Sequence, residues 1–386
     1  MRLLPLAPLL CFALALLACQ SPAQPASEPG AATASGPAAP PPAGEPPPAP
    51  APTVEEPLYQ RSRPLMGTVV AISIVGQEDP RVSAAVDAAF DEIARLEALL
   101  SEWRPDSEIS AINAAAGRGA VRVGAETLAV VRAGIEVSRW SEGAFDLSWA
   151  ALRGMYTFQP GEETIPDRAE IAARLPHIDY RKVVIDEGAS TVKLQETGMQ
   201  IGTGGIAKGY ALDRAAAVLR QAGIERYMLF GGGQVQVSGQ RKGRGWRVGI
   251  QHPRRDDYFG FLEATAGSIS TSGDYEHAFI RDGKRWHHII DPRTGLPTER
   301  SVSVTVLAES GIYADALSTA VFILGPERAL AKLAGAPGSP QVVIVDPELR
   351  LHVSPGTEDR LVMRARLDNG KLPLSHDAFE RPPGGR

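Results

Sequence analysis

A carboxylate and two hydroxyls lie within one helical turn of each other late in the chain. Asp315 and Thr319 are four residues apart in ADALSTAVFILG, residues 314–325, and Ser318 lies beside them. On a helix this spacing puts Asp315 and Thr319 on one face. Such hard oxygen ligands suit Mg²⁺, whereas a first-turn acid that complements the helix dipole would explain Asp315 alone. The apolar flanks predict a partly buried carboxylate, which needs a partner.

A second candidate is the glycine-rich segment GTGGIAKGYALD, residues 202–213. It follows a short β run and opens a helix, so its backbone amides and the positive helix end could hold an anion. It fits the dinucleotide motif GxGxxA, but the next β run lacks the closing acid and continues into three glycines, residues 231–233. Lys208 lacks the flanking residues that a P-loop requires. A plain glycine-rich turn is the structural alternative.

Adjacent histidines occur in a third stretch, which combines SISTSGDYEHAF at 268–279 with KRWHHIIDPRTG at 284–295. Side chains alternate in a regular strand, so His287 and His288 should point to opposite faces and cannot share one metal. The two cysteines of the chain are both within its first twenty residues, which excludes a cysteine-based zinc site in the folded part. His288, on the same face as Ile290, is either structural or an acid–base group at a pocket wall.

Composition limits the possible classes of protein. The chain has 386 residues and 44% hydrophobic content, enough for one large or two modest domains. Its formal charge of -5 and pI of about 5.9 provide no basic patch for nucleic acid, so we expect no nucleic-acid partner.

The N-terminus has the pattern of an export signal. Arg2 precedes an apolar run, residues 3–18, that is too short and too proline-broken for a transmembrane helix. The run ends in LLAC, residues 16–19, which resembles the bacterial lipobox and implies a lipoprotein signal peptide over 1–19 with lipid on Cys19. We expect a lipid-anchored protein of the bacterial envelope, on the outer face of the inner membrane or in the periplasm. The outer membrane is the alternative, because Gln20 is not the aspartate associated with inner-membrane retention.

The rest of the chain divides into three parts. Residues 20–57 are mostly Ala, Pro, Gly, Ser and Glu, which predicts a disordered tether. Residues 58–374 form one compact region, and 375–386 a polar tail. Apolar periodicity predicts helices over 81–103, 125–140 and 206–221. Short β runs joined by glycine-containing turns, including a hairpin over 278–290, predict an α+β fold with mostly antiparallel sheets.

Taken together, the three stretches resemble one family. GGIAKGYALD, TSGDYE, HHIIDPRTG and ADALSTA occur in this order in the ApbE family of FAD:protein FMN transferases, and MGT at 66–68 and GAFD at 143–146 are similar to its early motifs. The resemblance covers nearly all of the chain after the tether. It implies an ApbE-like, T-fold-like domain in which FAD lies in a groove and Mg²⁺ bridges to its pyrophosphate. FMN would pass to a threonine or serine of an acceptor protein, with AMP leaving.

The resemblance also implies roles for individual residues. Asp315, Thr319, Ser318 and the main-chain oxygen of Gly205 would bind the metal, and His288 would be catalytic, as the base for the incoming hydroxyl. The positions that match FAD contacts are Met66, Trp103, Ala144, Phe145, Asp146, Lys208 and Ile290.

Two departures from the family pattern keep other functions open. Gly202 and Gln234 stand where most members carry Asp, so part of the polar grip on FAD is absent or supplied from elsewhere. The alternatives are an FAD pyrophosphatase that gives FMN and AMP, and a lipoprotein that binds FAD without turnover.

Overall fold

The structure, a computed structural model, describes residues 56–375 and 378–379. The predicted signal peptide with Cys19, most of the predicted tether and much of the polar tail lie outside the described residues. The chain divides into two compact units between residues 53 and 54, and every described residue belongs to the second. Packing extends past both predicted ends of the compact region: Glu56 pairs with Arg226 at 2.8 Å, and Phe379 packs against a hydrophobic cluster.

An eight-stranded sheet in which all neighbouring strands are antiparallel is the centre of this unit. In spatial order its strands are β1 (Leu58–Leu65), β2 (Thr68–Val75), β6 (Tyr227–Gly231), β7 (Gln234–Ser238), β10 (Ala266–Gly273), β15 (Ser303–Ala308), β16 (Gln341–Val345) and β17 (Leu351–Val353). With the helices described below, it confirms the predicted α+β class.

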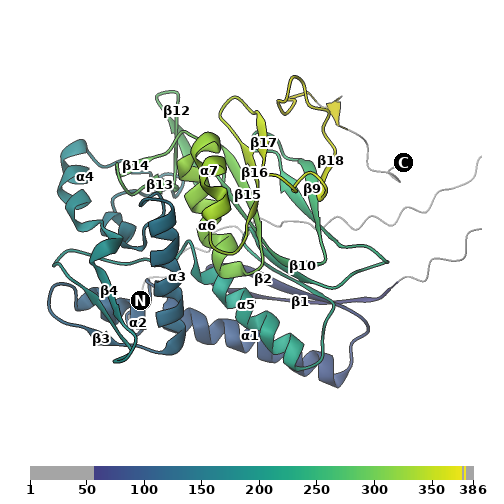
Figure 1. Ribbon diagram of the computed structural model, residues 1–386, viewed down its shortest axis with the longest axis horizontal. Helices are drawn as coiled ribbons and strands as arrows, with labels where there is room; N and C mark the ends of the chain where they lie inside the picture. The colour runs from purple at the N-terminus through teal and green to yellow at the C-terminus, as the bar shows by residue number, and fades with distance from the viewer. Residues whose placement is uncertain (1–55, 376–377, 380–386) are drawn as a thin grey trace, which may run out of the picture. The chain divides into compact units, whose positions relative to one another are not determined.

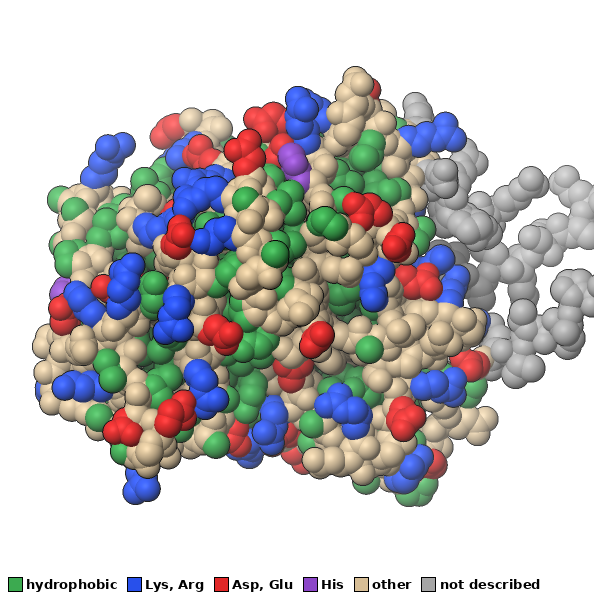
Figure 2. Space-filling view, in the orientation of Figure 1, with side chains coloured by type: hydrophobic (Ala, Val, Ile, Leu, Met, Phe, Trp, Pro, Cys, Tyr) green, Lys and Arg blue, Asp and Glu red, His purple; other side chains and the backbone are tan. Residues whose placement is uncertain are grey.

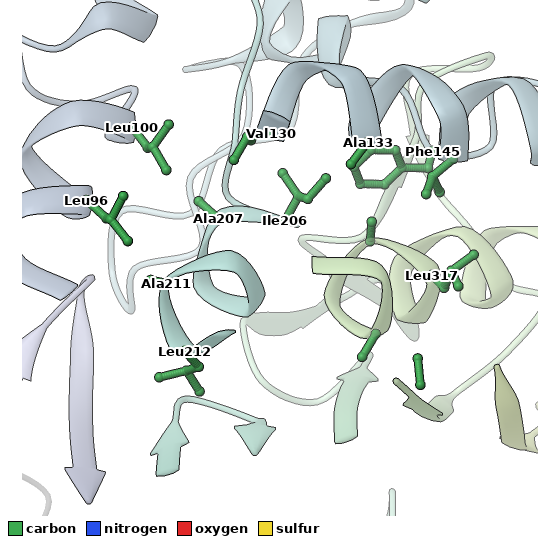
Figure 3. Packing of buried hydrophobic residues seen from close by; sticks show 14 of the residues in the cluster. Leu96, Leu100, Val130, Ala133, Phe145, Ile206, Ala207, Ala211, Leu212 and Leu317 are labelled. Carbon is green, nitrogen blue, oxygen red and sulfur yellow. The ribbon is translucent and has the colours of Figure 1, made fainter. Parts of the chain in front are cut away.

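The helices of the described region are α1 (Pro80–Leu100), α2 (Glu108–Ala114), α3 (Ala125–Trp140), α4 (Arg168–Arg174), α5 (Ala207–Gln221), α6 (Gly311–Leu324) and α7 (Pro326–Lys332). Of these, α1, α5 and α6 pack on one face of the large sheet. Helix α6 lies over β10 and β15 and contacts both α3 and α5, and α5 also packs along α1 (Figure 1). The first hydrophobic cluster fills this layer, and Figure 3 shows how side chains of α1, α3, α5 and α6 converge in it.

The other face of the sheet packs against a second layer. This layer contains β8 (Trp246–Gln251), β9 (Tyr258–Ala264) and β18 (Leu361–Met363). Alternation along the strands divides the two cores: Ile344 of β16 belongs to the first cluster, and Val343 and Val345 belong to the second. The central strands are therefore buried on both faces.

Smaller elements complete the described region. A three-stranded sheet joins β3 (Val121–Arg122), β5 (Thr191–Leu194) and β4 (Val183–Asp186). The predicted hairpin is confirmed as β11 (Ala278–Arg281) and β12 (Lys284–His287), and β13 (Ile290–Asp291) pairs with β14 (Leu296–Pro297). Asp282 and Gly283 both have positive φ at the turn, as a two-residue hairpin turn requires.

Helix α1 ends three residues earlier than the sequence pattern predicts. It ends at Leu100, and Ser101 takes an extended conformation with φ -67° and ψ 123°. The Oγ atom of Ser101 accepts a hydrogen bond from the backbone N of Trp103 at 3.2 Å, which stabilises a turn in place of the helix. The consequence is that Glu102 is buried while Trp103 is 72% exposed.

Helices α5 and α6 meet at two glycines. A Cβ atom on Gly209 would lie 1.9 Å from the carbonyl oxygen of Gly311, and one on Gly311 would lie 2.4 Å from that of Gly209. One turn further along α5, Asp213 accepts hydrogen bonds from the backbone N of Gly311 at 2.7 Å and of Ile312 at 3.0 Å. These N–H groups have no partner within α6, so α5 caps α6. We call this contact the α5–α6 crossing.

The surface shows no single dominant charge on the face drawn in Figure 2, where basic and acidic side chains are interspersed. None of the helices among residues 56–375 is both long enough and apolar enough to cross a bilayer.

We expect Gly209→Ala to lower the free energy of unfolding by roughly 3 kcal/mol or more, because the added methyl group meets the backbone of α6. Urea unfolding followed by circular dichroism measures the change. Gly119→Ala is the matched control, since a Cβ atom there meets nothing within 4 Å, and it should stay within about 0.5 kcal/mol of the parent. Equal unfolding midpoints for the two variants would contradict this account of the crossing.

Candidate active site

Asp315 lies in the second turn of α6 and faces α5. Its side chain is buried, and Oδ2 accepts a hydrogen bond from the backbone N of Gly209 at 2.9 Å. Burial raises the pKa of this carboxyl, and the positive charge of Lys208 and nearby backbone amides oppose the rise. Because Asp213 already caps α6, Asp315 is not needed as a first-turn acid. Its hydrogen bonds come from neutral amides, so its negative charge remains available to a cation.

Thr319 follows one turn later and lies against the loop that leads into α5. A Cβ atom on Gly205 would be 3.5 Å from Thr319 Oγ1 and 3.3 Å from Cε2 of Phe145. Gly205 is therefore in contact with α6 on one side and with an aromatic ring on the other. The structure thus places the backbone of Gly205 near Thr319, which lies one helical turn from Asp315.

Ser318 is oriented toward the sheet. Its Oγ donates a hydrogen bond to the carbonyl oxygen of Asp315 at 2.8 Å and lies 2.8 Å from Oγ of Ser272 and 3.3 Å from Oγ of Ser270, both on β10. These contacts account for its hydroxyl group. Metal binding by Ser318 stays a prediction.

Lys208, in the first turn of α5, provides the positive charge of the site. Its Nζ donates a hydrogen bond to the carbonyl oxygen of Gly204 at 3.1 Å. Lys208 and Met66 line the same small cavity beneath the β1–β2 turn. Met66 has φ 52°, a conformation that non-glycine residues rarely adopt, so the turn fixes where this residue lies. The structure thus brings two of the predicted FAD contacts together.

His288 lies in a bend just after β12, so the strand is not regular as far as Ile290, as the alternation argument assumed. The two histidines nevertheless diverge, which confirms that prediction. His287 Nε2 lies 2.8 Å from the carbonyl oxygen of Thr298, whereas the His288 ring packs edge-on against His277 at 5.1 Å between centroids.

The surroundings of His288 favour the neutral ring. The residue is exposed to solvent, but protein atoms crowd the ring and desolvate it, and the nearby His277, His287 and Lys208 also disfavour a positive charge there. Together they lower the pKa of His288 to about 3. At neutral pH the ring is therefore a free base with a nitrogen able to accept a proton.

The predicted FAD contacts at 144–146 form a buried turn. Phe145 covers Gly205, as described above. Asp146 Oδ1 accepts hydrogen bonds from the N and Oγ atoms of Ser148, and Oδ2 accepts one from the N of Tyr180 at 2.9 Å. Burial raises the pKa of Asp146, and these bonds oppose the rise. The carboxylate therefore fixes the turn that carries Ala144 and Phe145, and a direct contact between Asp146 and FAD stays a prediction.

The remaining predicted contacts come from two other elements. Trp103 lies in the turn after α1, with the guanidinium group of Arg153 5.0 Å from its ring centroid. Ile290 begins β13 and pairs with Pro297. For both residues contact with FAD stays a prediction.

The short β run predicted before the glycine-rich segment is β5, which ends at Leu194, so a connection of twelve residues separates it from α5. No strand is present between β5 and α5. Instead the side chain of Asn113 bonds both backbone groups of Ile201, at 2.9 and 2.7 Å, and thus does what a neighbouring strand would do. Since the sheets are antiparallel and no strand feeds α5, the Rossmann interpretation of this segment is excluded.

Gln234 is buried in β7 rather than at an open surface. Its Nε2 donates a hydrogen bond to Oγ of Ser268 at 2.6 Å, and its Oε1 atom has no partner among the described residues. The side chain therefore belongs to the layer beneath the helices.

Two groups at the site escaped the sequence prediction. Glu102 contacts the loop before α5, and Asp213 makes the α5–α6 crossing possible. Asp213 lies inside the glycine-rich motif, so its position at the end of that motif was a usable signal. Glu102 carries no such signal, because it enters the site only through the early end of α1.

The oxygen donors fit Mg²⁺ better than a softer metal. Within the described part of the chain, no three His, Cys, Asp or Glu side chains are grouped so that they could hold a metal. One carboxylate, one hydroxyl and one carbonyl form the weak, hard-oxygen set with which Mg²⁺ is held when waters and substrate phosphates supply the other ligands.

Comparison with known proteins finds relatives that share one name. A protein of Klebsiella pneumoniae (strain 342), named FAD:protein FMN transferase, is 34% identical over 279 residues, which are 72% of this chain and 85% of that protein. A protein of the same name from Treponema pallidum (strain Nichols) is 32% identical over 328 residues, 80% of this chain and 90% of the relative.

Solved structures show the same fold. The crystal structure of the ApbE protein from Thermotoga maritima matches with a TM-score of 0.72 and 30% identity, covering 78% of this chain and 99% of that one. The flavin transferase ApbE from Vibrio cholerae matches with a TM-score of 0.68 and 28% identity, covering 79% and 99%. The pattern of the ApbE family itself spans residues 66–344, a stretch that contains the α5–α6 crossing and every predicted site residue from Met66 to Thr319. The chain therefore belongs to the ApbE family.

Proposed function

We propose that this chain transfers the FMN part of FAD to a serine or threonine hydroxyl of an acceptor protein and releases AMP. The relatives bear the name of this activity. The observation that carries it here is the buried carboxylate of Asp315, held by neutral amides and set beside Thr319 and Gly205. Such a site suits charge neutralisation on a diphosphate rather than covalent catalysis by an enzyme nucleophile.

Asp315, Thr319 and the carbonyl oxygen of Gly205 would hold Mg²⁺, with Ser318 close behind them. When bound, the ion supplies positive charge to the phosphate oxygens of FAD. Lys208, in the first turn of α5, adds a second positive charge. Met66 and Phe145 line the same region and offer apolar contact area to the flavin nucleotide.

The transfer exchanges one bond to phosphorus for another. The acceptor oxygen bonds to the phosphorus of the FMN phosphate, and the bond from that phosphorus to the bridging oxygen breaks, so AMP leaves with that oxygen. The hydroxyl proton must also leave the acceptor. We assign its removal to the neutral ring of His288, whose lowered pKa keeps it unprotonated at neutral pH.

One assay separates transfer from its two alternatives. The full chain is incubated with FAD, Mg²⁺ and an acceptor protein, and both released AMP and covalent flavin fluorescence on a denaturing gel are measured. AMP with a labelled acceptor supports transfer, AMP with free FMN supports the pyrophosphatase, and bound FAD without AMP supports a binding protein. Asp315→Asn keeps the volume of the side chain but removes its charge, so we expect AMP release to fall at least about 100-fold.

Ser318→Ala is the matched control for Asp315→Asn on the same helix. Its hydroxyl bonds to β10, so we expect a much smaller loss and little change in the Mg²⁺ concentration that gives half-maximal activity. Full activity in Asp315→Asn would remove the basis of the metal assignment.

The pH dependence tests the role of His288. We expect His288→Asn to slow AMP release by about 100-fold or more, because a positioned base contributes that much. The ratio of parent to variant rates should stay constant from pH 7.5 to 5.5, since a base with a pKa of about 3 remains unprotonated across this range. An ordinary imidazole with a pKa of about 6.5 would lose about tenfold of its effect by pH 5.5, which would contradict the lowered pKa. A parent-like rate in His288→Asn would contradict the role of His288 as the base.

We also propose that the enzyme works from a lipid anchor on Cys19 in the bacterial envelope. The support is the sequence of residues 1–19 alone. Metabolic labelling with a fatty acid should mark the parent chain, and Cys19→Ala should lose the label and move to the soluble fraction of the envelope. Membrane association that survives this substitution would argue against the anchor.

A further inference from the structure

Glu102 is a buried carboxylate outside the motifs that define the site. It follows the last residue of α1 by two positions, and its side chain is 4% exposed. A glutamate is rarely buried to this extent without partners, because an unpaired charge in the interior is costly. The groups that contact the Glu102 carboxylate therefore indicate its role.

The partners of Glu102 belong to the loop that leads into α5. Its Oε2 accepts a hydrogen bond from the backbone N of Thr203, and its Oε1 lies 3.4 Å from a guanidinium nitrogen of Arg153. Thr203 Oγ1 donates in return to the carbonyl oxygen of Leu100 at 2.7 Å. The end of α1 and the loop 202–205 are thus joined by side-chain bonds in both directions.

The Glu102 carboxylate also takes the space that a side chain at position 202 would need. A Cβ atom on Gly202 would lie 2.6 Å from Glu102 Oε2 and 3.0 Å from Nε1 of Trp149. Position 202 can therefore be glycine with Glu102 present, and a larger residue there requires the glutamate to leave. The two positions compete for one volume.

The loop that Glu102 holds carries groups of the site at its far end. A Cβ atom on Gly205 would lie 3.5 Å from Thr319 Oγ1, and the carbonyl oxygen of Gly204 accepts a hydrogen bond from Lys208 Nζ. Burial raises the pKa of Glu102, and the charges of Arg153 and Lys208 and the amides of the loop oppose that rise. The carboxylate and Lys208 are therefore close enough to influence each other across the loop.

We propose that Glu102 is a positioning residue of the FAD site. From its position just after α1, its carboxylate holds the loop 202–205 in place. It acts through the Gly205 carbonyl and through Lys208 rather than on the reacting atoms. The inference rests on the proposed function for its substrate. It answers the question raised by Gly202, because the missing acid at position 202 is replaced by one from another element.

A double-mutant cycle tests this exchange of position. Four full-length proteins are compared: the parent, Glu102→Ala, Gly202→Asp and the double variant. The dissociation constant for FAD, from flavin fluorescence in the presence of Mg²⁺, is measured with kcat/KM for AMP release. We expect Glu102→Ala to lose roughly 10–100-fold, as removal of a supporting group around a binding site does. Gly202→Asp should lose at least as much, because two carboxylates then share one space.

The double variant should lose less than either single variant, since the aspartate can enter the space that the glutamate leaves, although Trp149 and Ala150 still border position 202 at 3.0 and 3.1 Å from a Cβ atom there. Losses that multiply in the double variant, or parent-like FAD binding in Glu102→Ala, would overturn the proposal. Glu102→Gln, which keeps the volume, guards against misfolding and should retain the parent melting temperature with weaker FAD binding. Asp106→Asn, in the same loop but exposed and paired with Arg104, is the matched control and should leave both constants unchanged.

The same experiment tests the proposed FMN transfer and the role of Glu102 separately. A parent chain that binds FAD but releases no AMP would refute the proposed transfer, while the FAD dissociation constants of the four proteins would still decide the role of Glu102.

Discussion

The backbone contact between α5 and α6 is the constraint on which the rest of the site depends. Gly209 and Gly311 allow the two helices to approach until their main chains touch, and Asp213 bonds the free amides of α6. At this distance the amide of Gly209 reaches Asp315. A wider crossing would leave that carboxylate without its hydrogen bond and would separate Gly205 from Thr319. The proposed metal ligands on α6 and in the loop before α5 thus depend on glycine at positions 209 and 311.

Charge is balanced around that contact by groups from distant parts of the chain. Two buried carboxylates, Glu102 and Asp315, lie on either side of Lys208, and the positive charge of the lysine opposes the rise that burial causes in the pKa of each. The same charge helps to keep His288 neutral. Burial is the main cause of each shift, and Lys208 contributes to all three beside Arg153 at Glu102 and the histidine pair at His288.

Much of this could be predicted from the sequence, and the exceptions have physical reasons. Apolar periodicity gave α3 its observed bounds and α5 to within one residue, since both helices bury one face. The spacing of Asp315 and Thr319 predicted their shared face because it is a local property. Periodicity failed at α1, where Ser101 ends the helix by a local side-chain bond, and it gave no sign of the bonds by which Asn113 holds Ile201 before α5. The bonds of Glu102 and of Ser318 join elements far apart in sequence, and no local pattern encodes them.

The two-sided burial of the large sheet has a consequence for how this protein can change. Side chains of the second core pack against β8, β9 and β18, whereas the proposed oxygen donors lie on the helical side. The large sheet therefore separates the second core from the site. The family pattern ends at residue 344, before β17 and β18. Of the second layer only β18 lies beyond that pattern, since β8 and β9 fall within it. A substitution in the second core would therefore reach the oxygen donors only through the sheet.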